Sequence, residues 1–364
     1  MRLSDATRWT IELTIGRTFL PALLALACAC GGGGGAGREE QSGPGSAGGD
    51  KTPTAAGRSW QAPAGFEEVP IPDDNPMTPE KVALGGQLFF DQRLSGDGTR
   101  SCYSCHVCEQ GLTDGLPTSV GAFGKKLPRS SPSLWNIGYH TEFYWDGRSP
   151  SLEAQALAAW KGANMGANPD SIAQVLNQIA GYREQFQQVF GTEATADAIV
   201  KAISAYERTI LCGNTAFDRW QQGDENAVSA RAKQGWEVFR GKAACGTCHA
   251  GILFTDLQYH NVGIGMDKET PDIGRNKVSN EDKHLGAFKT PSLRDVTRSA
   301  PYFHDGSVAT IEEAVKLVAG GGRENPHRDP LLKPANLTDD EMGALLDLLA
   351  TLECPCDLKA PPLP

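Results

Sequence analysis

Two short stretches of this sequence share a combination of Cys and His residues that can do chemistry. Each has two Cys residues separated by two positions and followed at once by a His. In such a motif the thiols add to the two vinyl groups of a porphyrin, and the His becomes the proximal iron ligand. The sequence therefore predicts two covalently bound haem c groups, held by Cys102, Cys105 and His106 and by Cys245, Cys248 and His249.

Two other uses of these Cys pairs compete with haem attachment. A redox-active Cys-x-x-Cys pair needs a βαβ setting, and the sequence shows no such alternation around either motif. A zinc site would combine the four thiols, but it would leave the His after each pair unexplained. Haem attachment accounts for all six residues.

The composition narrows the class of partner. The chain has 364 residues and a formal net charge of −10, with an isoelectric point near 5.3. Such an acidic balance argues against nucleic acid as a partner. It fits a protein that attracts a basic electron carrier.

Four further Cys residues in the body of the chain are free to pair in an oxidising compartment. We expect Cys212 to pair with either Cys354 or Cys356, because a bond between the last two, separated only by one Pro, would be strained. Cys108 is expected to be a small buried residue.

The N-terminus is typical of an exported protein. Residues 1–30 combine Arg residues with an apolar run too short to span a bilayer, which predicts a signal peptide. The run ends at Cys28 and Cys30, and either is a candidate for lipidation as in bacterial lipoproteins; cleavage without lipid is the alternative. Residues 31–65 are rich in Gly, Ser and Pro and predict a flexible tether. These features place the protein in the periplasm of a Gram-negative bacterium, tethered to the membrane by its lipid.

Helices must position the two motifs. Thr78 and Pro79 predict an N-cap and first helical residue before the first motif, and residues 230–239 predict a helix before the second. Residues 168–220 are expected to be helical, with Ile172, Val175 and Leu176 on one face and Ile199, Ile203 and Ile210 on another.

A repeat follows both motifs. Pro-Ser-Leu at 132–134 and 291–293 is followed, at identical spacing, by Asp-Gly at 146–147 and 305–306 and then by a helix start. Thr310 and Glu313 form a capping box at the second of these starts. We therefore predict a mainly α fold with few short strands, in which two cytochrome c-like haem domains (66–220 and 221–356) are related by internal duplication and followed by a tail, 357–364.

With these motifs the sequence resembles the bacterial di-haem cytochrome c peroxidase family, which includes the MauG-type enzymes. The matching stretches span residues 75–352 and include 132–136, 144–148, 288–294 and 300–306. The resemblance implies that the N-terminal haem meets peroxide, that the C-terminal haem accepts electrons, and that Trp145 lies between them. It also implies a calcium ion between the domains, with Ser299 and Pro301 at two backbone-ligand positions and Ser130 where the family has an Asn.

The chain departs from the family pattern around the first haem. Ala122 stands where the family has a His ligand, which implies an iron open to peroxide without reductive activation. Asn164 stands where the family has a Glu that shuttles a proton, and an amide can hydrogen-bond peroxide but cannot act as a general base. Gln155 matches a distal glutamine of the family.

The second haem also lacks its expected sixth ligand. The family has a Met or Tyr where this chain has Val318, and the corresponding position in the first domain is Ala159. Neither side chain can bind iron. Met266 is a candidate replacement, although a Met on a loop is more often a packing residue. His260 could also approach this haem, or could be a hydrogen-bonded residue behind it.

Three functions are compatible with these residues. The first is a di-haem peroxidase that reduces hydrogen peroxide to water, with Trp145, Gln155 and Asn164 in its catalytic machinery and electrons from a small cytochrome c or cupredoxin. The second is a MauG-like oxidase acting on a partner protein. The third is an electron-transfer cytochrome without peroxide chemistry. Family members are often dimers, so a homodimer is a further expectation.

Overall fold

The computed structural model describes residues 59–364, all within one compact unit that spans Lys51–Pro364. This part of the chain is mainly helical, as predicted, and its one sheet has two short antiparallel strands. The predictions for residues 1–30 and for most of the tether lie outside the described residues. We call residues 66–220 the first half and residues 221–356 the second half.

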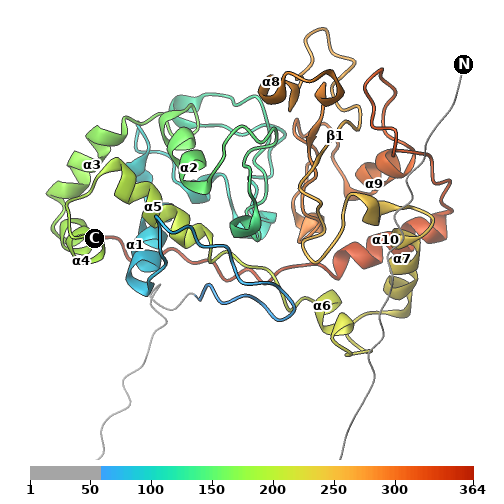
Figure 1. The fold of residues 1–364 in the computed structure, drawn as a ribbon, viewed down its shortest axis with the longest axis horizontal. Helices are drawn as coiled ribbons and strands as arrows, with labels where there is room; N and C mark the ends of the chain where they lie inside the picture. The colour runs from blue at the N-terminus through green and yellow to red at the C-terminus, as the bar shows by residue number, and fades with distance from the viewer. Residues whose placement is uncertain (1–58) are drawn as a thin grey trace, which may run out of the picture. The chain divides into compact units, whose positions relative to one another are not determined.

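The helices follow the chain in the order shown in Figure 1. The first half contains α1 (Pro79–Phe90), α2 (Leu152–Lys161), α3 (Pro169–Gln178), α4 (Ala180–Phe190), α5 (Ala196–Glu207) and α6 (Ala216–Gln221). The second half contains α7 (Ala230–Arg240), α8 (Asn276–Ser279), α9 (Ile311–Ala319), α10 (Asp339–Ala350) and the strands β1 (Tyr259–His260) and β2 (Phe288–Lys289). Short 3-10 turns at Cys102–Ser104 and Cys245–Thr247 carry the two Cys-x-x-Cys motifs.

The predicted helix starts are confirmed. Thr78 caps α1 with Pro79 in the first turn, and Thr310 and Glu313 form the capping box of α9. Two details of the predicted faces are wrong. Val175 is 45% exposed although its neighbour Leu176 is fully buried, and Ile210 is buried beyond the end of α5 rather than on it. In both cases packing against other segments, not helical periodicity, decides burial.

Each half is built on one close helix crossing. In the first half α1 packs on α5, and a Cβ added to Gly85 would lie 1.9 Å from the carbonyl oxygen of Ala202. In the second half α7 packs on α10, and a Cβ added to Gly235 would lie 2.0 Å from the carbonyl oxygen of Ala344. Each crossing therefore depends on a residue without a side chain, and each lies just before its haem motif.

Two disulfides join the end of the second half to the first half. Cys212 pairs with Cys354, one of the two C-terminal Cys residues that were predicted as its partner. The expectation for Cys108 is incomplete: it is buried, but it is bonded to Cys356. Sequence spacing could not reveal this pair, because the two residues are 248 positions apart.

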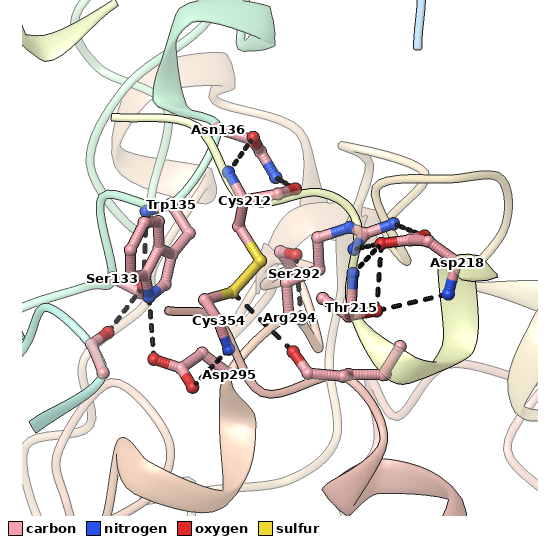
Figure 2. Close-up of a disulfide and its surroundings, with 12 residues drawn as sticks. Ser133, Trp135, Asn136, Cys212, Thr215, Asp218, Ser292, Arg294, Asp295 and Cys354 are labelled. Carbon is pink, nitrogen blue, oxygen red and sulfur yellow. Dashed lines mark hydrogen bonds and ion pairs between the residues drawn. A yellow bond between two sulfur atoms is a disulfide. The ribbon is translucent and has the colours of Figure 1, made fainter. Parts of the chain in front are cut away.

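A hydrogen-bond cluster surrounds the Cys212–Cys354 disulfide (Figure 2). Asn136 both accepts from the backbone N–H and donates to the carbonyl of Cys212, at 2.9 and 3.0 Å. Buried Asp295 accepts from the Trp135 indole at 2.8 Å and from the backbone N–H of Cys354 at 3.1 Å. Residues from both halves thus hold the crosslink in place.

The two ends of the described chain each contact the other half. The guanidinium of Arg294 lies 4.8 Å from the centre of the Phe66 ring. At the other end, Arg93 donates to the carbonyl of Pro364 at 3.2 Å, so that residues 357–364 lie against the first half (Figure 1). Within residues 59–364 no helix has both the length and the apolar character needed to cross a membrane.

Candidate haem sites

The two motif histidines are held in the same way. The Nδ1 atom of His106 lies 3.0 Å from the carbonyl oxygen of Leu112, and the Nδ1 atom of His249 lies 3.0 Å from that of Phe254. A carbonyl oxygen can only accept, so each ring carries its proton on Nδ1 and keeps the Nε2 lone pair for a metal. Burial also lowers the pKa of both rings, which favours this neutral form. Both sites fit the proximal ligand of a haem iron.

The motif thiols are equally suited to attachment. None of the four takes part in a disulfide. Burial raises the pKa of Cys105 to about 11 and that of Cys245 to about 11, so both sulfurs are protonated in the chain without haem. The predicted covalent residues are therefore brought together in both halves.

A cavity of about 380 Å³ lies over the second motif. Its lining is mainly apolar and includes Cys245, Cys248 and His249 together with Trp145 of the first half. Such a lining fits the flat, apolar face of a porphyrin. Val318 lines this cavity as the resemblance implies, whereas Met266 is not among its lining residues and packs its sulfur against Gly286.

His260 faces two carboxylates rather than an open ligand position. Its Nδ1 lies 2.6 Å from Asp329 Oδ2, and its Nε2 lies 3.0 Å from Asp256 Oδ2. Hydrogen bonds with the Cys248 thiol, Asp329 and Asp256 raise the pKa of His260 to about 10 in the chain without haem, and after haem attachment the two carboxylates still act to raise it. Cys248, Asp256 and His260 lie close enough to hold a metal, but haem attachment uses the Cys248 sulfur.

His304 is a cavity residue that sequence reasoning missed. It is buried, lines the second cavity and stacks on Phe288 with the ring centres 3.6 Å apart. Burial lowers the pKa of His304 to about 4, so the ring is neutral. The sequence did contain a signal for this residue. His304 precedes an Asp-Gly pair at the position where the first half has Trp145.

Backbone contacts bring together Ala122 and Asn164, the two residues near the first haem that differ from the family pattern. The buried Ala122 donates from its N–H to the carbonyl of Asn164 at 3.0 Å. The neighbouring Gly121 packs so closely on the carbonyl of Ala163 that a Cβ would lie 2.0 Å away. The loop that carries a His in the family therefore lies directly on the segment with Asn164. Gln155 lies on α2, and its backbone carbonyl accepts from the Tyr144 hydroxyl at 3.4 Å.

Trp145 connects the halves. Its indole N–H donates to the carbonyl of Ser130 at 3.0 Å, and its own carbonyl accepts from the backbone N–H of Lys289 at 2.8 Å. Its side chain lines the cavity of the second half although the residue belongs to the first. Trp145 therefore reaches from the first half to the cavity over the second motif.

The residues expected at a calcium site lie on one segment of the second half. Ser299 donates from its hydroxyl to the carbonyl of Val296 at 3.0 Å, and Pro301 follows a cis peptide bond. Ser130, which replaces the family's Asn, instead donates to the carbonyl of Phe303 at 2.8 Å.

Glu207 is a second residue that the sequence did not single out. It is 5% exposed at the end of α5, and its Oε2 has no hydrogen-bond partner among residues 59–364. Burial raises the pKa of Glu207 to about 8, and burial next to Glu207 raises the pKa of Cys102. A neutral carboxyl therefore lies beside the first haem attachment site.

Fold and sites together define a protein with two covalent c-type haems in a mainly helical frame. A family model described as di-haem cytochrome c peroxidase matches residues 79–226. The methylamine utilization protein MauG of Methylorubrum extorquens is 40% identical over 304 residues, which cover 82% of this chain and 85% of that protein. Cytochrome-c peroxidase IdrP1 of Denitromonas iodatirespirans is 38% identical over 335 residues, which cover 82% of this chain and 88% of that protein.

A solved structure gives the same result. The crystal structure of a MauG-like protein associated with microbial copper homeostasis superposes with a TM-score of 0.77 at 33% identity, covering 83% of this chain and 97% of that one. The chain belongs to the di-haem cytochrome c peroxidase family, as its motifs predicted. It is an oxidoreductase, and the family binds two haem c groups.

Proposed function

We propose that this protein is a peroxidase that reduces hydrogen peroxide to water at its first haem. The observation that carries the proposal is the position of Ala122. The loop that would supply a ligating His instead places a buried methyl group on the Asn164 segment, to which it is fixed by a backbone hydrogen bond of 3.0 Å. This favours an iron that accepts peroxide without prior reduction.

In this proposal each of the candidate side chains has a separate role. Hydrogen peroxide supplies the oxidising equivalents, which the two haem groups would store when bound, and His106 and His249 would hold their irons. Gln155 and Asn164 orient peroxide by hydrogen bonds, and Asn164 cannot take up a proton. Trp145, which lines the second cavity, carries electrons between the halves. The electrons come from a small cytochrome c or cupredoxin.

A second candidate is a MauG-like oxidase that acts on a partner protein. The 40% identity to MauG and the 33% identity to the MauG-like structure favour it. Val318 counts against it, because this chain has no Tyr at the position where the family has a Met or Tyr ligand for the second haem. The two candidates share the peroxide step and differ in the source of electrons.

Several finer features belong to the same proposal. We infer export to the periplasm of a Gram-negative bacterium with a lipid at Cys28 or Cys30, two domains related by duplication, and a homodimer. We also infer calcium binding through the carbonyls of Ser299 and Pro301. Chelation followed by metal analysis and by EPR of the first haem tests the calcium site, with loss of about one calcium per chain as the expected result.

Stopped-flow mixing of the ferric holoprotein with peroxide tests the proposed function. Rapid, stoichiometric loss of peroxide without reductant is expected. The matched variant is Ala122→His, which offers the missing ligand, with Ala122→Ser as the control of similar size. We expect the His variant to require reduction before it reacts and the Ser variant to react as the parent does. Equal, slow rates for all three proteins would contradict the proposal.

A further inference from the structure

A tyrosine–carboxylate pair links the two halves outside the haem cavities. The hydroxyl of Tyr259, at the start of β1, donates to Glu142 Oε2 at 2.7 Å. Arg275 completes the cluster: its Nη2 donates to Glu142 Oε1 at 2.9 Å, and its guanidinium lies 4.2 Å from the centre of the Tyr259 ring. Glu142 belongs to the first half and the other two residues to the second.

This cluster lies on the turn that contains the relay tryptophan. Arg275 Nη1 donates to the carbonyls of Asp146 and Gly147, both at 3.1 Å, and to the Tyr259 hydroxyl at 3.3 Å. The hydroxyl lies so close to Gly147 that an added Cβ would be 1.7 Å from it. Glycine at 147 is therefore what lets the phenol reach the turn, two residues after Trp145.

A second short connection runs through the sheet. Tyr259 pairs with Lys289 across the two strands, and the backbone N–H of Lys289 donates to the carbonyl of Trp145 at 2.8 Å. Tyr259 is thus connected to Trp145 through Arg275 and through Lys289. Arg275 contacts the carbonyls of Asp146 and Gly147, and Lys289 contacts that of Trp145, so an oxidisable ring is joined by short contacts to the segment that carries the relay.

The electrostatics suit coupled loss of an electron and a proton. Burial and the hydrogen bond to Glu142 raise the pKa of Tyr259, so the phenol keeps its proton in the resting protein. Burial acts to raise the pKa of Glu142, but hydrogen bonds from Tyr259 and Arg275 outweigh it and hold that pKa below its usual value. A neutral phenol therefore donates to a carboxylate, a base within proton-transfer distance.

Tyr259 is partly exposed and also borders a cavity other than the one over the second motif. Tyr259 lines a second cavity of about 370 Å³, together with the basic residues Lys283 and Arg328. Asp329, the partner of His260, lines both this cavity and the one over the second motif. A reductant in the outer cavity can therefore reach Tyr259 without entering a haem cavity.

We propose that Tyr259 is a redox-active residue that passes oxidising equivalents from the relay to an external one-electron reductant, with Glu142 as its proton acceptor. On oxidation the phenol loses one electron towards Trp145 and its O–H proton to Glu142 Oε2. Reduction by the external donor returns the electron, and Glu142 returns the proton. Two such cycles supply the two electrons that, with two protons from solvent, convert one hydrogen peroxide into two waters.

The inference rests on the proposed function, because peroxide is the terminal oxidant. Freeze-quench EPR of the holoprotein after one equivalent of peroxide, with and without ring-deuterated tyrosine, detects the radical. A tyrosyl signal that narrows on deuteration and is lost in Tyr259→Phe is expected. Tyr139→Phe is the matched control, since Tyr139 donates to a backbone carbonyl, that of Glu67, at 2.8 Å.

Glu142→Gln separates proton transfer from packing. The amide oxygen still accepts the hydrogen bond of 2.7 Å but cannot take the proton, so we expect the radical yield to fall and its solvent isotope effect to change. An unaltered radical in Tyr259→Phe, or its loss in the control Tyr139→Phe instead, would overturn the inference while peroxide consumption continues. No peroxide consumption in any variant or in the parent would overturn the proposed function and this inference with it.

Discussion

The two haem sites share a frame and differ in the residues that surround it. Both have a 3-10 turn for the Cys residues, a proximal His bonded to a carbonyl at 3.0 Å, and a Gly at a close helix crossing. Beside the first motif lies the buried acid Glu207, whereas the second motif lies under a mainly apolar cavity lined by Val318 and the buried His304. In the proposed function the shared frame holds the cofactor, and the differing residues divide peroxide chemistry from electron entry.

Removing each proximal ligand in turn is expected to give the largest effect and the clearest contrast. His106→Ala should abolish the reaction with peroxide. His249→Ala should leave one rapid reaction with peroxide and stop turnover with a donor, because the thioethers still hold each haem. Stopped-flow and steady-state assays distinguish these results; identical losses in both variants would break the contrast between the sites.

Restoring a base at the first site should sharpen the contrast. Asn164→Glu supplies a group that can accept and return a proton, which typically contributes about 10²–10⁴-fold to a rate. We expect faster peroxide consumption in that range and a new pH dependence below neutral pH. Asn164→Gln, of similar size but without a base, is the control and should show no gain.

The shared frame predicts equal costs in both halves. Gly85→Ala and Gly235→Ala each place a Cβ about 2 Å from a backbone carbonyl, and such overpacking usually costs about 1–3 kcal/mol. Denaturant unfolding should show similar losses for the two variants. A large loss for only one would mean that the crossings do not play the same part.

Glu207 should give the first half a distinctive pH dependence. Burial raises its pKa from 4.5 to about 8, so its contribution to folding stability is fully present below pH 4.5 and declines as pH rises to about 8. The slope expected is about 1.4 kcal/mol per pH unit over that window. Glu207→Gln stays neutral and should flatten the decline, as measured by unfolding at several pH values.

What the sequence predicted was local. The haem motifs, the caps at Thr78 and Thr310 and the matched Asp-Gly turns depend on residues a few positions apart, and the structure confirms those helix starts. The Cys108–Cys356 disulfide joins residues 248 positions apart and escaped prediction. The Tyr259–Glu142 contact, 117 positions apart, did so for the same reason, since no local pattern encodes a meeting between halves.

The most direct test of the central claim is EPR of the purified ferric holoprotein before and after one equivalent of peroxide. The account predicts a high-spin ferric signal from the first haem that disappears on mixing while a new radical signal grows. Two low-spin signals that do not change with peroxide, before or after partial reduction, would contradict it. The protein would then be an electron-transfer cytochrome with both irons already ligated.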